Sequence, residues 1–126
     1  MNLLDECIDL LSPHVQVLNE VDSDFIFEYM ELVIPFHSSG RVDWRKIASK
    51  KLILSLNELG NIIKYDSTVY VCWDDANLPV LSCKLKILVE NLYDITWVSF
   101  DTWLFNPDEE WIIEFYHEGE VVFGKI

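Results

Sequence analysis

The amino-acid sequence predicts an α+β fold, with N-terminal helices packed on one face of a mostly antiparallel sheet formed by the C-terminal half. Apolar residues recur at helical spacing before residue 60 but alternate with a period of two after Asp66. The later strands are separated only by turns, so we expect them to pair antiparallel. The 126 residues suffice for a single domain, 1–126, with a helical part over about 1–60 and a sheet-rich part over about 66–126.

Three helices are predicted in the N-terminal half. Residues 2–11 (NLLDECIDLL) carry apolar side chains at helical spacing and are followed by Pro13. A second helix over 22–34 starts at an N-cap, Asp22 or Ser23, and stops before Pro35. Its expected inward face consists of Phe25, Ile26, Tyr29, Leu32 and Val33. A third helix is expected from Asp43 or Trp44 to Leu59, with Gly60 as its C-cap.

The next segments combine strands with a fourth helix. Residues 67–73 (STVYVCW) are β-branched and aromatic, which predicts a strand with Val69, Val71 and Trp73 on one face. Residues 74–79 form a loop, and 80–82 are either a short strand or the start of a helix. The helix itself is predicted over 82–94.

The last third is predicted to be a series of antiparallel strands. Residues 95–105 read as one strand or a bent pair, and 106–109 (NPDE) as a turn. Residues 110–117 and 120–126 form a hairpin across Glu118-Gly119. Alternation places Trp111, Ile113, Phe115 and His117 on the core face and Glu110, Ile112, Glu114 and Tyr116 on the other. Trp73, Trp97 and Trp111 are expected in the core, and the exposure of Trp103 is left open.

Negative charge is concentrated in the second half of the chain. The net charge is −13, and residues 65–126 carry 12 acids but only 3 bases. From Ile87 to Gly124 there is no Lys or Arg. Such a field repels nucleic acid and anionic membranes and speeds encounter with a basic protein. We therefore expect neither nucleic acid nor a membrane as partner.

The cysteines and the N-terminus indicate a cytoplasmic protein. Cys7, Cys72 and Cys83 are far apart in apolar surroundings, which predicts buried free thiols and neither zinc nor a disulfide framework. The N-terminal MNLLDECIDL has no basic region and is not expected to be a signal peptide. No apolar run reaches the length of a membrane span.

Motifs of catalysis and metal binding are missing. The three histidines are scattered, and no nucleophile elbow or phosphate-binding glycine loop is present. His117 beside Glu118 and Glu120 leaves a small hydrolase as one hypothesis, but a turn histidine is the commoner outcome. The acidic stretches NPDEE and WDDANLP lack the glycine and oxygen spacing of a calcium loop. The sequence therefore predicts no enzyme, no metal and no cofactor.

The acids and aromatic residues of the second half favour a protein-binding surface instead. Aromatic rings supply affinity at an interface, and charges supply association rate and specificity. The candidate partner-binding residues are Asp74, Asp75, Trp103, Asp108, Glu109, Glu110, Glu114, Tyr116 and Glu118. The alternative is an adaptor or a homo-oligomeric structural domain. In that case the one basic cluster, at 41–51, docks a second subunit; the cluster can also be a solvated helix face or offset the acidic half internally.

Two stretches also resemble a known family. VSFDTWLFNPDEEWIIEFYHEGEVVFGKI, preceded by VYVCWDDANLP, resembles the C-terminal part of bacterial immunity proteins of contact-dependent growth inhibition (CdiI-type) and related polymorphic-toxin systems. The resemblance covers roughly residues 69–126. It implies an inhibitor that binds the toxin domain of its own strain and blocks its active site or substrate surface. Many such toxins are basic nucleases, which an acidic inhibitor would suit. The sequence leaves the oligomeric state unknown.

Overall fold

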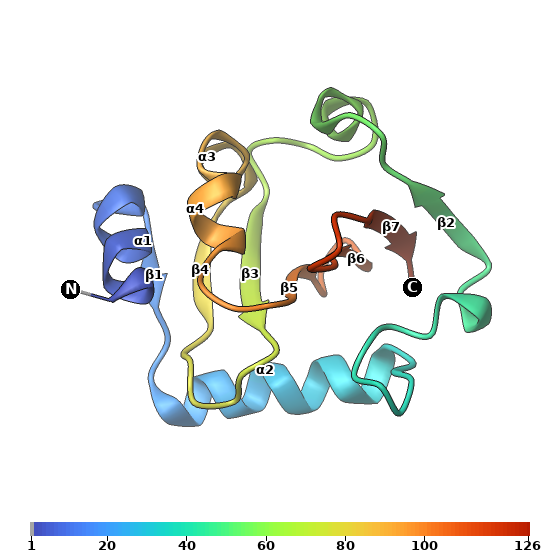
Figure 1. Ribbon diagram of the computed structural model, residues 1–126, viewed down its shortest axis with the longest axis horizontal. Helices are drawn as coiled ribbons and strands as arrows, with labels where there is room; N and C mark the ends of the chain where they lie inside the picture. Colours follow the sequence, from blue (N-terminus) through green and yellow to red (C-terminus); the bar gives the residue numbers. More distant parts are fainter. Residues whose placement is uncertain (1) are drawn as a thin grey trace.

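One seven-stranded antiparallel sheet organises the protein, as seen in the computed structural model, which describes residues 2–126 (Figure 1). The strand order is β1-β4-β3-β5-β6-β7-β2, and every neighbouring pair is antiparallel. Five of the strands come from the C-terminal half, and helices precede them in the chain. The predicted α+β class, with N-terminal helices and a mostly C-terminal antiparallel sheet, is confirmed.

The first third of the chain contains two helices and a short strand. They are α1 (Leu3–Leu11), β1 (Gln16–Val17) and α2 (Glu20–Val33). Each helix begins after a capping asparagine: the side chain of Asn2 accepts the backbone N–H of Asp5, and that of Asn19 accepts the N–H of Asp22, both at 2.8 Å. Both predicted helices are present. The second begins earlier than expected because Asn19 provides the cap.

Helix α2 is rotated about its axis relative to the prediction. The buried Ser23 hydroxyl accepts the backbone N–H of Val80 at 3.0 Å, which fixes this side of the helix against the sheet. Met30 lies on the same side and is buried. Phe25 and Leu32, which were expected to face inward, consequently point to solvent.

Residues 43–59 do not form the predicted third helix. The structure has a 3-10 turn η1 (Trp44–Lys46), strand β2 (Ser49–Leu52) and a 3-10 helix η2 (Leu56–Asn61). Strand β2 pairs with β7 at the edge of the sheet. Ile47 and Ile53 lie in apolar clusters on opposite faces of the sheet. The chain therefore passes along the sheet edge in extended form, because one amphipathic helix cannot bury both residues.

The segment predicted as a single helix over 82–94 is a strand followed by two short helices. Strand β3 (Thr68–Trp73) pairs with β4 (Leu81–Lys84), so the first residues of the predicted helix are extended. The chain then turns into α3 (Leu85–Glu90) and α4 (Leu92–Thr96). The strand alternative for 80–82 is the correct one, because Leu81 pairs with Val71 of β3.

The C-terminal strands form a meander, β5 (Thr102–Asn106), β6 (Trp111–Phe115) and β7 (Val121–Lys125). Gly119 has a φ of 99°, which confirms the expected turn. The strand predicted over 95–105 starts only at Thr102, because Ile95 and Thr96 complete α4. Trp97 follows this helix and is 58% exposed, so its predicted place in the core is wrong.

Helices cover both faces of the sheet, whereas the sequence predicted one. Helices α1, α3 and α4 pack with Val71, Leu104 and Ile113 in the larger apolar cluster. Helix α2 packs with Cys72 and Phe105 in the cluster on the opposite face. Successive residues of a strand point to opposite sides, and both Val71 and Cys72 are fully buried. Central strands that are apolar on both sides need a layer on each side.

The three cysteines are free and buried, as predicted. Burial, with smaller contributions from Asp94 and Cys83, raises the pKa of Cys7 to about 11. Burial also raises the pKa of Cys72 and of Cys83. The thiolate is the reactive form of cysteine, so both the pKa and the packing suppress reaction.

We expect the folded protein to be inert to thiol reagents at pH 8. A disulfide reagent read by absorbance should modify none of the three thiols until urea unfolds the chain, and should then modify all three. Rapid modification of any cysteine in native buffer would contradict the buried positions of these side chains.

Candidate functional site

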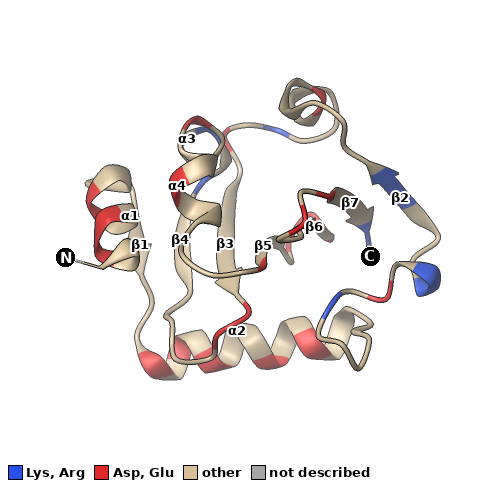
Figure 2. Cartoon of the chain, in the orientation of Figure 1, with Lys and Arg blue, Asp and Glu red and all other residues tan. Residues whose placement is uncertain are grey.

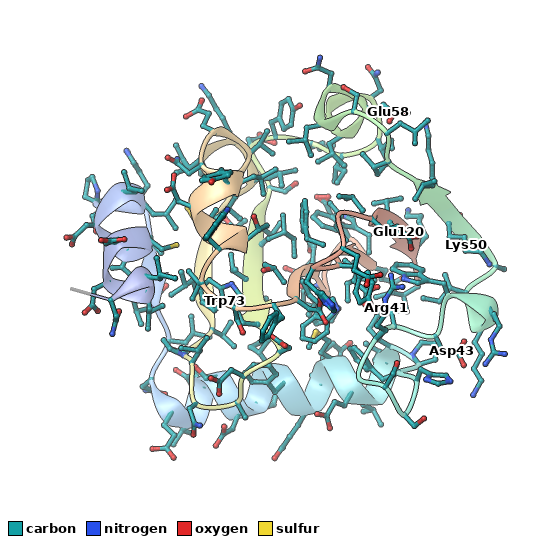
Figure 3. All side chains as sticks on the ribbon, in the orientation of Figure 1. Arg41, Asp43, Lys50, Glu58, Trp73 and Glu120 are labelled. Atoms are coloured by element: carbon teal, nitrogen blue, oxygen red, sulfur yellow. The ribbon has the colours of Figure 1, made fainter. Side chains whose placement is uncertain are left out.

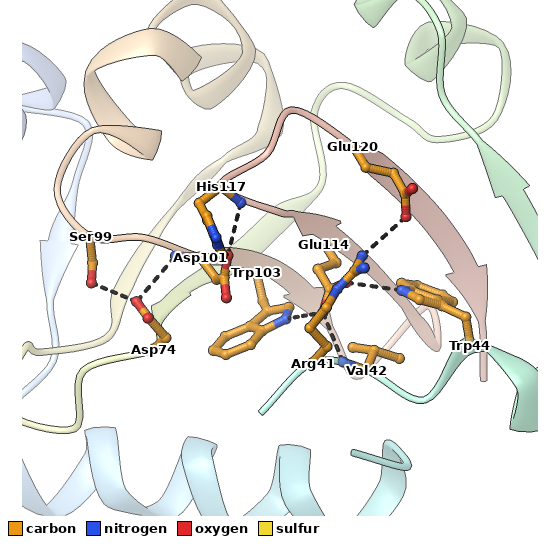
Figure 4. Close-up of polar contacts among 10 residues, drawn as sticks. All are labelled: Arg41, Val42, Trp44, Asp74, Ser99, Asp101, Trp103, Glu114, His117 and Glu120. Carbon is orange, nitrogen blue, oxygen red and sulfur yellow. Dashed lines mark hydrogen bonds and ion pairs between the residues drawn. The ribbon is translucent and has the colours of Figure 1, made fainter. Parts of the chain in front are cut away.

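A buried carboxylate lies in β6, one residue before the end of the strand. Glu114 is 0% exposed and accepts five hydrogen bonds (Figure 4). Its Oε1 accepts from Arg41 Nη2 at 2.7 Å and Nε at 3.0 Å, and from Trp44 Nε1 at 3.0 Å. Its Oε2 accepts from the backbone N–H of Val42 at 2.8 Å and from Trp103 Nε1 at 3.0 Å. We call these five residues the Glu114 cluster.

Arg41 extends the cluster to the surface. Its Nη2 also donates to Glu120 at 3.1 Å, and the two side chains point toward one another (Figure 3). Its guanidinium lies 3.7 Å from the ring centroid of Tyr116, in cation–π geometry. Burial disfavours the charge of Arg41, but the carboxylates of Glu114 and Glu120 outweigh burial and raise the pKa of Arg41.

The predicted exposure of Glu114 is therefore wrong. The strand alternation holds over Trp111–Phe115, whereas His117, predicted on the core face, is exposed beyond the end of the strand. The second face of β6 is covered by α2 and by the segment that carries Arg41 and Trp44. Trp103 is buried as well. A carboxylate can be buried only when its charge and lone pairs are compensated, and the five N–H groups do so. Glu114 and Trp103 therefore lie beneath the surface, where Glu114 holds the partly exposed Arg41 in place.

An open pocket of about 780 Å³ lies beyond the end of β6, where Tyr116, which contacts Arg41, is one of its lining residues. It is formed by the α4–β5 connection and the β6–β7 turn, which contribute Trp97, Phe100, Tyr116 and His117. Phe100 is 74% exposed, and its ring packs edge-on against His117 with centroids 5.7 Å apart. We call this the aromatic pocket. Large exposed rings in a pocket are characteristic of protein-binding sites.

Carboxylates hold the pocket in shape. Asp101 Oδ1 accepts the backbone N–H of His117 at 2.9 Å and lies 3.0 Å from its Nδ1. Asp74 Oδ1 accepts from the hydroxyl of Ser99 at 2.5 Å and from the backbone N–H of Asp101 at 3.2 Å (Figure 4). The carboxylate beside His117 is thus Asp101, and neither Glu118 nor Glu120 pairs with the ring as the sequence suggested. These contacts tie together the ends of β3, β5 and β6.

Apart from the buried Trp103 and Glu114, the predicted site residues separate into two groups at opposite ends of the sheet. Asp74, Asp75, Tyr116 and Glu118 lie at the end with the aromatic pocket, where β3 ends, β5 begins and β6 ends. Asp108, Glu109 and Glu110 lie in the β5–β6 turn, about 15 Å away along a five-residue strand. In that turn Glu109 accepts a hydrogen bond from the Ser67 hydroxyl, and Glu110 has a φ of 59°. The structure therefore brings together only part of the predicted set.

Sequence reasoning missed Trp97, Phe100 and Asp101 as site residues. The interpretation of 95–105 as strand hid all three, since it placed Trp97 in the core. The helical spacing of Leu88, Leu92 and Ile95 contains the missing signal, because it continues the helix to residue 96 and leaves the next residues in a connection.

Within residues 2–126, no group of three or more His, Cys, Asp or Glu side chains could hold a metal ion. The same residues contain no helix long and apolar enough to cross a membrane. Exposed aromatic side chains in a pocket are features of a surface that binds another protein. Fold and site together define an acidic α+β protein of the protein-binding class.

The sequence matches the family model described as CdiI immunity protein EcoliA0-like over residues 1–124, and the chain belongs to this family. It is an immunity protein of contact-dependent growth inhibition, whose partner is a toxin. A comparison with curated proteins finds no match. The family match extends over the N-terminal helices as well as the C-terminal stretches whose sequence resembles such proteins.

Replacing Glu114 with Gln tests the buried cluster. The amide keeps the shape but has one accepting oxygen, and its NH₂ would face N–H donors. We expect Glu114→Gln to lower the free energy of unfolding by about 3 kcal/mol, the cost of breaking a buried charge pair. Glu118→Gln, at the exposed turn beyond the same strand, should change it by less than about 0.5 kcal/mol. Urea unfolding followed by tryptophan fluorescence measures both; equal midpoints would contradict the structural role of Glu114.

Proposed function

We propose that this immunity protein neutralises a cognate toxin domain, a basic nuclease, by charge-complementary occlusion of its active site. It acts in the cytoplasm, by binding rather than catalysis. The observation that carries the proposal is the aromatic pocket with Asp74, Asp75 and Glu118 at the same end of the sheet. The rings supply the apolar contacts of an interface, and the carboxylates select a cationic partner.

The distribution of charge supports a cationic partner. Lys and Arg gather around η1 and β2 at one edge, whereas Asp and Glu follow α1, α2 and the 74–75 loop (Figure 2). Several of the cations already have partners within the chain. Lys51 pairs with Glu58, and Arg45 and Lys46 pair with Asp43. Asp43 consequently has a lowered pKa, mainly through its hydrogen bond with Arg45. These cations are already neutralised locally, and the net charge of the whole chain is −13, so acids outnumber bases on the rest of the surface.

A nuclease is the toxin class that this surface suits best. Nucleases bind phosphates through Lys and Arg, and about half or more of the hydrogen bonds in protein–DNA complexes go to phosphate and sugar oxygens. Carboxylates placed against those cations occupy the position of the phosphates and exclude the nucleic acid. The separate group of Asp108, Glu109 and Glu110 contributes long-range attraction from the other end of the sheet.

A pair of charge-matched double variants tests the docking end. Asp75→Lys with Glu118→Lys changes the exposed end near the aromatic pocket, and Asp108→Lys with Glu110→Lys makes the same charge change at the opposite end. We expect the first to weaken binding to the cognate toxin domain by about a hundredfold, largely through faster dissociation. The second should slow association by about threefold and leave dissociation unchanged. Surface plasmon resonance at several salt concentrations measures both rates.

Wild-type affinity in both variants, with no dependence on salt, would show that charge does not drive binding. The nuclease assignment has its own readout: the toxin domain should cleave DNA or RNA, and one equivalent of this protein should stop cleavage. A toxin domain that leaves nucleic acid intact would refute that part of the proposal.

A further inference from the structure

Helix α2 presents an apolar stripe to solvent. Val21, Phe25 and Leu32 are 76%, 65% and 81% exposed, and at 100° per residue they fall within roughly 40° of one another around the helix axis. They lie opposite the buried side of the helix, which carries Ile26 and Met30. A surface helix normally has a polar outer face. Helix α2 instead has a second apolar face that is not buried in the folded chain.

Carboxylates surround this stripe. Glu20, Asp24, Glu28 and Glu31 line one side of it, Asp22 lies on the other, and all are exposed. Residues 1–40 contain no Lys or Arg. Figure 2 accordingly shows acidic positions and no basic ones along the whole of α2. An apolar centre with an acidic rim is complementary to an apolar patch surrounded by Lys and Arg.

The acidic rim of the stripe leads through Glu31 toward the aromatic pocket described above. A second pocket of about 430 Å³ is lined by Glu31 and Met30 from α2 and by Asp74 from the β3–β4 loop. Asp74 in turn binds Ser99, which lines the aromatic pocket. The two surfaces are therefore continuous through Glu31 and Asp74, and a partner docked at one end can extend to the other.

A second copy of the chain is a poor occupant. The acidic rim would have to meet the basic residues at η1 and β2 of the other molecule. Three of them, Arg45, Lys46 and Lys51, already pair with Asp43 and Glu58. The excess of acid over base disfavours self-association further.

We propose that the outer face of α2 is a docking surface for the toxin domain, with Val21, Phe25 and Leu32 buried against an apolar patch ringed by Lys and Arg. This inference rests on the proposed function, because it takes the same cationic partner. Covering the stripe removes apolar area from water, which the fold of the isolated chain cannot do.

The double variant Phe25→Gln, Leu32→Gln tests the docking surface. We expect it to weaken binding to the cognate toxin domain by at least about thirtyfold while leaving the salt dependence unchanged, because no charge is altered. Leu52→Gln with Leu54→Gln is the matched control: both side chains are exposed, and they lie at the basic edge. The control should bind within about threefold of the wild type, and urea unfolding should give near-native midpoints for both variants.

A fluorescent label reports on the same surface without relying on weakened binding. The native cysteines are buried, so an environment-sensitive dye attaches selectively to Val21→Cys. We expect its emission to shift to the blue when the toxin domain is added. The same dye at Leu54→Cys should show no shift.

The outcomes separate this inference from the proposed function. Native affinity of the Phe25/Leu32 variant and an unshifted dye, together with weakened binding of the Asp75/Glu118 variant, would overturn the α2 surface alone. Native toxin affinity in every variant would overturn both the α2 docking surface and the proposed function. Concentration-dependent dimers in sedimentation, abolished by the Phe25/Leu32 change while toxin affinity stays native, would assign the stripe to a second copy and refute the inference.

Discussion

The structure depends on the compensation of one buried carboxylate. Glu114 lies in an inner strand of the sheet and accepts five hydrogen bonds, four of which are donated by Arg41, Val42 and Trp44. These bonds hold the irregular chain between α2 and β2 against the face of β6. The packing leaves little freedom, because a Cβ on Gly124 would lie 2.5 Å from the Trp44 ring. A charge that is costly to bury thus dictates where a segment without regular structure must lie.

The same compensation shapes the surface. Arg41 pairs with Glu114 and Glu120, and its guanidinium lies over the ring of Tyr116. Its positive charge is therefore neutralised by these two carboxylates and does not offset the other acids of the C-terminal half. Asp43 and Glu58 engage further cations along the β2 edge. Among residues 2–126, the carboxylates at the end with the aromatic pocket contact local N–H, hydroxyl and histidine groups and pair with no Lys or Arg. The acidic character of the pocket end therefore follows from the ion pairs that Arg41 and the β2-edge cations form elsewhere in the chain.

Local periodicity was sufficient for much of the fold. The first two helices, strand β3 and the C-terminal hairpin follow from apolar spacing and turn residues, and the α+β class follows from their order. Contacts between distant residues decide the rest. Glu114 and Arg41 are 73 residues apart, so alternation could place the carboxylate on its face but could not show that the face is covered. Ile47 and Ile53 lie in a segment whose apolar residues have helical spacing, yet they pack in apolar clusters on opposite faces of the sheet. This arrangement follows from the pairing of β2 with β7 at the sheet edge, which local spacing does not show.

Helix α2 shows how a local pattern can satisfy two requirements at once. Its sequence offers two apolar faces, and the single buried hydroxyl of Ser23, bonded to Val80, decides which of them meets the sheet. The rejected face keeps Phe25 and Leu32 in water, among carboxylates that repel one another and no cations. Neither feature stabilises the isolated chain: exposed rings favour aggregation, and like charges oppose compaction. Both become favourable against a basic surface with an apolar centre, so the features that the fold leaves unsatisfied are those that binding would satisfy.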